Sequence, residues 1–223
     1  MKPRTYSCRG GSLALQPKED VTTSTSINFA EHNESDFMER TLVLIKPEAV
    51  KRAISGRIIS KLEDAGLKIV AMKMIVPDRK LAEAHYPLDR EWCEALWKKT
   101  KEAYDAKGQK LSLNAMELGK KIRGNLINHI SNKPIIAMVL EGNGAISFTR
   151  KIVGATSPEK ADPSTIRGSF SIDSYANADR NGRPVLNLVH ASDSVKTAES
   201  EIRVWFKKNE IFDYKTAQQD FIY

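Results

Sequence analysis

The sequence has little cysteine and no long hydrophobic run. Its 223 residues include two cysteines, Cys8 and Cys93, whose spacing fits neither a metal-binding nor a redox motif. A disulfide framework is therefore not expected. No segment reaches the roughly 18 consecutive apolar residues of a transmembrane helix. We expect no membrane-embedded part and a reducing compartment, the cytoplasm.

The common glycine-rich phosphate-binding motifs are also missing. Neither G-x-x-x-x-G-K-[S/T] nor a complete G-x-G-x-x-G occurs in the sequence. Phosphate chemistry would therefore have to rely on side chains. Three cations beside breaks between predicted elements are candidates: Lys46, Arg150 and Arg167. Taken singly, each could equally be a surface cation or an ion-pair partner.

The overall composition is that of an ordinary globular protein. Hydrophobic residues make up 41% and charged residues 28%, and the length suffices for one domain with a core and an appended tail. The formal net charge of +7 attracts polyanions such as nucleotides, nucleic acid or acidic membranes. The sign alone does not choose among them. The short lysine clusters are typical of solvated helix faces, so support for nucleic-acid binding is weak.

Residues 1–37 differ from the rest of the chain. They contain a polar TTSTS run and a Gly-Gly breaker, and their apolar residues show no sustained period. We expect a disordered extension before a domain at 38–223. The segment lacks the apolar core of a secretory signal, although its basic, acid-free start could be an organellar transit peptide. Alternatively, Met38 could be the true initiator.

Regular apolar periodicity begins at Thr41. Apolar runs bounded by Pro or Gly indicate buried strands, and apolar residues three or four positions apart indicate helices. The expected strands are 41–45, 67–76 and 134–142, with β segments at 169–173 and 185–189. The expected helices are 54–65 with Gly66 as its stop, 79–106 with a break at Pro87, one ending near 129–130, 145–154, and a last helix capped by Ser192 or Asp193. This order predicts an α+β fold, a ferredoxin-like split βαβ sandwich whose antiparallel sheet is covered by helices.

A single histidine, His190, lies between an apolar run and a Ser-Asp-Ser cluster in NLVHASDS. For an arbitrary histidine, the more frequent explanation is the end of a strand followed by the cap of a helix. A neutral imidazole is nevertheless a good nucleophile near pH 7. A helix N-terminus just beyond it would disfavour the imidazolium and stabilise an incoming phosphate.

Several motifs occur together in one order, and they favour a functional role for His190 over a purely structural one. They are ERTLVLIKPEAV, the His85-Tyr86 pair, VLEG, VGATSP, TIRGSF, NLVHASDS and TAESEI. In this order they resemble the nucleoside diphosphate kinase family over roughly residues 39–223. The pattern N-x-x-H-[G/A]-S-D-S is highly specific for that family. Ala191 stands where glycine is common, a small change that the family accepts.

The resemblance implies a ping-pong phosphotransferase. His190 would take the γ-phosphoryl group of a nucleoside triphosphate, typically ATP, and pass it to a nucleoside diphosphate, which maintains NTP and dNTP pools. Ser192 and Glu201 would support the histidine, with Tyr86 beside it. The nucleotide-binding residues implied are Lys46, Arg150 and Arg167 on the phosphates, and Thr156 and Asn187 on phosphate and ribose. Magnesium would arrive with the nucleotide, so no protein metal ligands are expected.

The resemblance also implies a homo-oligomer, a tetramer or hexamer, and an aromatic lid over the base, for which Trp92 is the candidate. Core packing is an equal alternative for Trp92. Two segments, 93–126 and 174–184, are longer than the family pattern, and the first predicts an enlarged helical hairpin insertion that covers the nucleotide. A solvated extension without nucleotide contact is the alternative.

Two other functions are compatible with such a fold. One is a binding protein that acts on nucleic acid or a protein partner through its basic surface. The other is a histidine phosphotransfer protein that acts on other proteins. The presence of His190, Lys46 and both arginines argues against the first, and the presence of Thr156 and Asn187 argues against the second.

Overall fold

The computed structural model describes residues 38–106, 108–217 and 219. The extension predicted at 1–37 lies outside the described residues. The strands are β1 (Met38–Ile45), β2 (Lys68–Ile75), β3 (Ile135–Asn143) and β4 (Val189–Ala191). The helices are α1 (Pro47–Lys51), α2 (Ser55–Glu63), α3 (Arg79–His85), α4 (Arg90–Asp105), α5 (Ala115–Ile130), α6 (Ala145–Val153), α7 (Ile166–Phe170), α8 (Tyr175–Arg180) and α9 (Val195–Trp205), with short 3₁₀ turns at Pro158–Lys160 and Lys208–Glu210.

The four strands form one sheet in the order β2-β3-β1-β4, and each neighbouring pair is antiparallel. Strands β1 and β2 are consequently parallel to each other with β3 inserted between them, and β3 and β4 are parallel with β1 between them. Two split βαβ units interleave in this way. The ferredoxin-like α+β prediction is confirmed.

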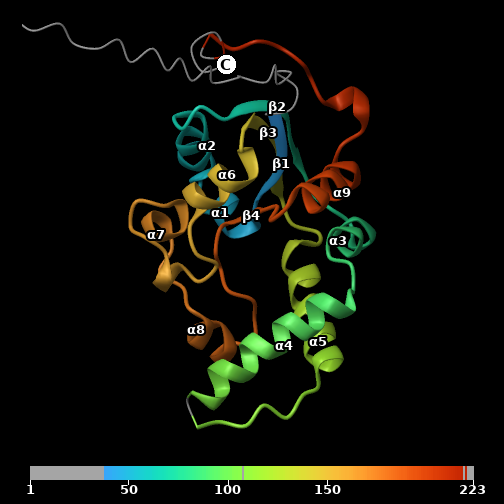
Figure 1. Cartoon of the computed structure of the whole chain (residues 1–223), viewed down its shortest axis with the longest axis vertical. Coiled ribbons are helices and arrows are strands. Elements are labelled where there is room, and N and C mark those ends of the chain that lie inside the picture. Colours follow the sequence, from blue (N-terminus) through green and yellow to red (C-terminus); the bar gives the residue numbers. More distant parts are fainter. Residues whose placement is uncertain (1–37, 107, 218, 220–223) are drawn as a thin grey trace, which may run out of the picture. The chain divides into compact units, whose positions relative to one another are not determined.

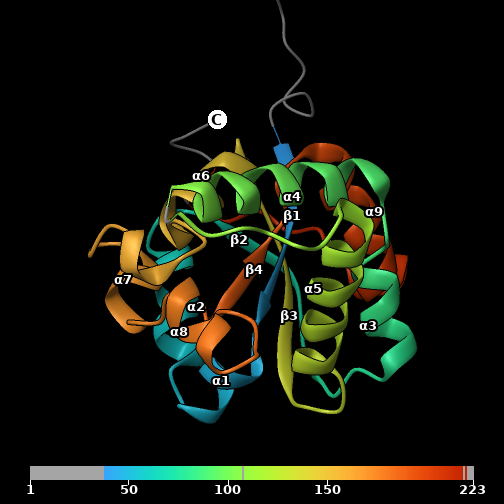
Figure 2. The same ribbon diagram turned by 90° about the horizontal axis from the view of Figure 1, so that it is seen from below.

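Strand β1 lies in the middle of the protein because both of its faces are apolar. Val43 and Ile45 contact a core on one face, together with buried side chains of α2, α6 and α7. Leu42 and Leu44 contact a second core on the other face, together with α3, α5 and α9. Figures 1 and 2 show these two helix groups on opposite sides of the sheet. The four consecutive apolar residues 42–45 are typical of a strand that is covered on both faces.

Three details of the predicted elements were wrong. The expected β segment 169–173 overlaps α7, which begins where the Thr165 hydroxyl accepts a hydrogen bond from the backbone N–H of Gly168. The expected β segment 185–189 joins the sheet only at Val189, because Leu188 has a left-handed backbone with φ 70°. The last helix is capped by Ser194, whose side chain accepts from Thr197, and not by Ser192 or Asp193.

The segment between β2 and β3 forms the expected helices. Pro87 separates α3 from α4, and a capping box between Asn114 and Glu117 begins α5. Helices α4 and α5 contact each other, and the ribbon shows them as a hairpin below the sheet (Figure 1). No helix in the described part of the chain is long and apolar enough to cross a membrane.

A glycine sets the separation of the two hairpin helices. Cys93 of α4 is 1% exposed, and a Cβ at Gly119 of α5 would collide with its Sγ atom. In the same helix, a Cβ at Gly124 would meet nothing within 4 Å. The first glycine therefore permits close packing, and the second makes no packing demand.

We expect Gly119→Ala to destabilise the hairpin by about 1–3 kcal/mol, because the added methyl group must push α4 from α5 or displace Cys93. Gly124→Ala is the matched control and should be neutral or stabilising by up to about 1 kcal/mol, since alanine favours helix. Thermal unfolding of both variants, with hydrogen exchange at 90–105, measures the difference. Equal melting temperatures for the two variants would refute this packing argument.

Candidate active site

His190 lies on the short edge strand β4, opposite Leu44 of the central strand β1. Its side chain is 21% exposed, so it can meet a ligand while its backbone stays fixed by the sheet. Its Nε2 atom lies 2.9 Å from the Oε2 atom of Glu201, which projects from α9. The strand and the helix thus bring together two residues that the sequence proposed as partners.

Ser192 fixes the carboxylate that His190 contacts. Its hydroxyl donates to the same Oε2 atom of Glu201 at 2.6 Å and accepts from the backbone N–H of Leu42 at 3.3 Å. An ionised carboxylate only accepts hydrogen bonds, so a neutral His190 places its proton on Nε2. The lone pair then resides on Nδ1.

A second histidine, His85, packs against the first. Its ring centroid lies 4.5 Å from that of His190 in an edge-on arrangement, and its Nδ1 atom accepts from the indole N–H of Trp205 at 3.2 Å. Burial holds the pKa of His85 well below its ordinary value, with the charges of His190 and Lys46 acting in the same direction. The neighbour of His190 is therefore neutral and adds no competing charge.

Tyr86 follows His85 in the chain, with ring centroids 4.4 Å apart. Burial raises the pKa of Tyr86, and the negative charge of Glu201 raises it further. The sequence hypothesis placed Tyr86 beside His190, and the structure adds His85, whose ring contacts that of His190. The His-Tyr motif was the available signal, but nothing in it indicated that His85 would contact His190.

Three ligand atoms from His85, His190 and Glu201 lie within 4.8 Å of one another, close enough to share a metal ion. The hydrogen bonds already described account for this clustering. His190 and Ser192 bind one oxygen of Glu201, and Trp205 binds His85.

Lys46 is a buried cation at the end of β1. Its Nζ atom donates to Oδ1 of Asn187 at 2.6 Å, and the side-chain amide of Asn187 donates to the carbonyl of Thr156 at 3.0 Å. Burial lowers the pKa of Lys46 to about 8; the negative charge of Glu48 opposes this effect and the positive charge of Arg167 adds to it. Three residues proposed for nucleotide binding are therefore linked.

Arg167 of α7 is 8% exposed and holds the backbone around the site. Its guanidinium donates to the carbonyls of Asn187 at 3.1 Å, Gly154 at 2.8 Å and Val189 at 2.8 Å. Two of the five N–H groups of an arginine remain for another acceptor. Burial lowers the pKa of Arg167 to about 10, and the charge of Arg150 contributes. Arg167 is thus both a scaffold residue and a cation close to Arg150.

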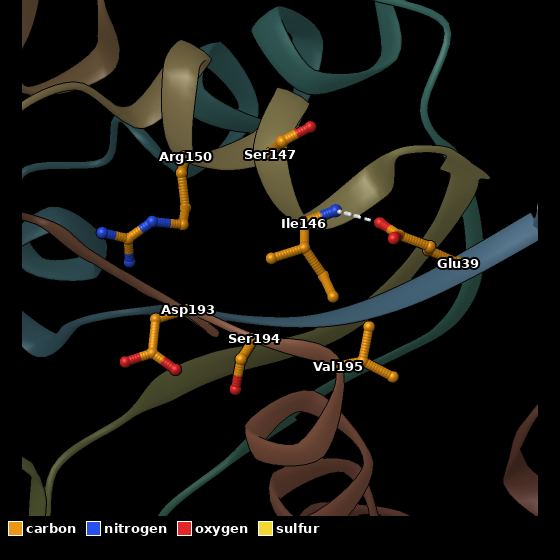
Figure 3. A pocket seen from close by; sticks show the side chains of 7 residues that line it. All are labelled: Glu39, Ile146, Ser147, Arg150, Asp193, Ser194 and Val195. Carbon is orange, nitrogen blue, oxygen red and sulfur yellow. Dashed lines mark hydrogen bonds between the residues drawn. The ribbon is translucent and has the colours of Figure 1, made fainter.

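Arg150 is exposed on α6 and lines a hollow of about 490 Å³ with Asp193, Ser194 and Val195, at the start of α9. Figure 3 shows the side chains of Arg150 and Asp193 on facing walls of this hollow. The full lining is Glu39, Ile146, Ser147, Arg150, Asp193, Ser194 and Val195. His190 and Lys46 are not part of it, so the hollow adjoins the histidine cluster and does not contain it.

Trp92 lies in the first turn of α4, where the Asp89 carboxylate caps its backbone N–H. Its side chain is 36% exposed, and one edge of its ring faces Gly119 of α5. These contacts belong to the hairpin. They leave part of the indole accessible, as a residue that stacks on a base would require.

The second long segment, 174–184, is held by one carboxylate. Asp173 accepts from Arg183 at 2.6 Å, from the backbone N–H of Leu186 at 2.7 Å and from Asn177 at 2.6 Å. The hydrogen bonds from Arg183 hold the pKa of Asp173 far below its ordinary range although burial opposes them. The segment forms α8 and returns the chain to Asn187.

Chemically, the site presents a nucleophilic Nδ1 atom on a fixed imidazole, close to a buried lysine and two arginines. Such a combination suits the capture of a phosphoryl group, because transfer needs a nucleophile, alignment and charge neutralisation.

Comparison with known proteins agrees with this chemistry. The family model described as nucleoside diphosphate kinase matches residues 39–103 and 99–211. The nucleoside diphosphate kinase of Pyrobaculum aerophilum is 44% identical over 181 residues, covering 79% of this chain and 99% of the relative. That of Thermococcus kodakarensis is 41% identical over 177 residues, covering 79% and 82%. The two family segments meet within α4, where the sequence predicted an insertion.

Solved structures of similar proteins show the same fold. An NDP kinase from Pyrobaculum aerophilum superposes with a TM-score of 0.75 at 43% identity, covering 79% of this chain and 100% of the other. A nucleoside-diphosphate kinase from Borrelia burgdorferi, described as a transition state mimic with bound vanadate and ADP, superposes with a TM-score of 0.67 at 34% identity. That match covers 82% of this chain and 96% of the other.

The lowered pKa of Lys46 predicts pH-dependent anion binding. A lysine is cationic below its pKa and neutral above it. With a pKa of about 8, most Lys46 side chains are charged at pH 7, and roughly a tenth remain so at pH 9. The affinity of the parent for inorganic pyrophosphate, measured by calorimetry, should therefore fall as the pH rises. The affinity of Lys46→Met should fall less, so the ratio between the two proteins should decrease. The variant corrects for the ionisation of pyrophosphate itself. Parallel pH profiles for parent and variant would contradict the assignment.

Proposed function

This chain belongs to the nucleoside diphosphate kinase family and is a nucleotide phosphotransferase, and we propose that it works by a ping-pong mechanism in which His190 carries the phosphoryl group. A nucleoside triphosphate donates its γ-phosphoryl group to His190 and leaves as the diphosphate. A second diphosphate then accepts the group. In the cell, this reaction would maintain NTP and dNTP pools.

The observation that carries the proposal is the fixed orientation of His190. With Nε2 bound to Glu201, the lone pair of Nδ1 attacks the γ-phosphorus, an N–P bond forms, and the bond to the bridging oxygen breaks. The ring gains positive charge in this step. The Glu201 carboxylate, held by Ser192 at 2.6 Å, stabilises that charge and keeps the ring aligned for the return transfer.

Lys46, Arg150 and Arg167 would neutralise the phosphates. Lys46 has additional N–H donors beyond the one given to Asn187, and Arg167 has two beyond its carbonyl contacts. Arg150 is exposed and carries charge close to Arg167. The nucleotide would arrive as its magnesium complex, in which the ion bridges phosphate oxygens and keeps much of its water.

Asn187 and Thr156 would bind ribose and phosphate. The Asn187 amide is oriented by its contacts to Lys46 and to the Thr156 carbonyl, and retains one N–H for a ribose hydroxyl. The exposed side chain of Thr156 keeps its hydroxyl available for a phosphate oxygen.

We propose that the chain assembles into a homo-oligomer, a tetramer or hexamer, and exposed apolar residues of β2 support self-association. Strand β2 is at one end of the described sheet, and its surface exposes Met72 by 54%, Met74 by 63% and, just beyond the strand, Val76 by 58%. Apolar side chains exposed together at the end of a sheet are typical of a protein contact surface.

We expect His190→Ala to lower phosphate exchange from ATP to GDP by at least about a thousandfold, because the variant has no group to carry phosphate. Its melting temperature should stay close to that of the parent, since the side chain is partly exposed. For the parent, initial-rate plots at several GDP concentrations should give parallel lines, and labelled ATP should yield an acid-labile phosphoprotein. Converging lines, or substantial activity in the variant, would instead indicate direct transfer.

We also propose that Trp92 stacks on the base as part of the α4–α5 lid. Trp92→Ala should weaken the binding of ADP and of GDP by a similar factor, about tenfold. Stacking of one aromatic ring on a base contributes roughly 1–3 kcal/mol whatever the base. Trp92→Phe keeps an aromatic face and should retain most of the affinity. If alanine and phenylalanine bind both nucleotides like the parent, Trp92 is a packing residue of the hairpin.

A further inference from the structure

A strained residue lies directly before the strand that carries His190. Leu188 has φ 70°, a left-handed conformation that a branched side chain adopts only when its surroundings enforce it. The side chain is 0% exposed and packs in the core under β1. It is therefore anchored in the core while its backbone turns the chain into β4, two residues before His190.

Two hydrogen bonds from α1 and its N-cap hold Leu188 itself, while Arg167 holds the flanking carbonyls of Asn187 and Val189. The backbone N–H of Leu188 donates to Oε1 of Glu48 at 3.0 Å. Its carbonyl accepts from the backbone N–H of Lys46 at 2.8 Å. Both polar groups of the strained residue are thus held, one by a backbone and one by a single side chain. Glu48 is the member of this arrangement that a substitution can remove.

The other oxygen of Glu48 contacts the lid hairpin. Its Oε2 atom lies 2.8 Å from Nε2 of His129, in the last turn of α5. The two side chains are only 11% and 14% exposed. Burial alone would raise the pKa of Glu48, but the hydrogen bond from His129 and the charge of Lys46 lower it below its ordinary value. The carboxylate therefore stays ionised and accepts from both partners.

We propose that Glu48 is a positioning residue for His190, held in place by His129. By fixing Leu188, it sets where β4 begins and hence where the imidazole points relative to the phosphate-binding cations. Through His129, the same carboxylate ties the nucleophile's strand to the base of the α4–α5 hairpin. This inference rests on the proposed role of His190 as phosphoryl acceptor.

Glu141, a buried carboxylate outside the histidine site, provides the control that distinguishes a positioning role from a loss of stability. Glu141 of β3 is 6% exposed and accepts from Lys68 at 2.6 Å and Arg40 at 2.7 Å. It resembles Glu48 in burial and in having two partners, but those partners lie outside the histidine site. Glu141→Ala should lower the melting temperature without slowing phosphoryl transfer.

The test is single-turnover labelling of the full chain with γ-³²P-ATP. We expect Glu48→Ala to slow phosphorylation of His190 by about tenfold to a hundredfold, because a misplacement of about 1 Å has an effect of up to that size. The half-saturating ATP concentration should change by less than about twofold. Glu48→Gln should recover most of the rate, since its amide oxygen can accept from Leu188. His129→Ala should slow labelling by a smaller factor, and it serves in place of Glu48→Ala should that variant not fold.

Distinct results overturn the inference. The inference is wrong if Glu48→Ala is labelled as fast as the parent. If Glu48→Ala does not fold, the same result in His129→Ala overturns it. An equal slowing in Glu141→Ala would also do so, because stability alone would then explain the effect. A parent that takes no label overturns the proposed function, and with it this inference, whereas a labelled parent with unaffected variants overturns this inference alone.

Discussion

One carboxylate oxygen of Glu201 binds both the ring of His190 and the hydroxyl of Ser192. This shared contact requires β4 to lie at the sheet edge, α9 to pack across β1, and Ser192 to reach the backbone of Leu42. The buried β1 is what makes all three arrangements possible, because it pairs with β4 on one side and supports α9 on its face. The fold therefore fixes the orientation of the His190 imidazole.

Much of this could be predicted from the sequence, for identifiable reasons. An apolar run such as TLVLI is typical of a buried strand and identified β1, and the order of strands and helices along the chain indicated the α+β class. His190, Ser192 and Glu201 lie in adjacent motifs, and the spacing that places a helix after the strand brings them together. Lys46, Asn187, Thr156 and Arg167 were named from separate motifs, and the structure links them by hydrogen bonds.

The failures arose where a contact depends on residues far apart in the chain. The left-handed backbone of Leu188 moved the start of β4, and leucine gives no local sign of such a conformation. One of the hydrogen bonds that hold it comes from Glu48, to which the sequence motifs assigned no role. His129 lies 81 positions from Glu48 and belongs to no recognised motif. Periodicity and motif order predict contacts between residues close in the chain, but not hydrogen bonds between residues far apart in it.

Asp173 has an implication for how such proteins diverge. It binds Arg183 within the 174–184 segment and also the backbone of Leu186 just past it, so the segment begins and ends at one clamped point. We therefore expect changes in the number of residues between Asp173 and Arg183 to leave the geometry at Asn187 largely unaltered. On this basis the length of the 174–184 segment can vary during evolution separately from the residues around His190.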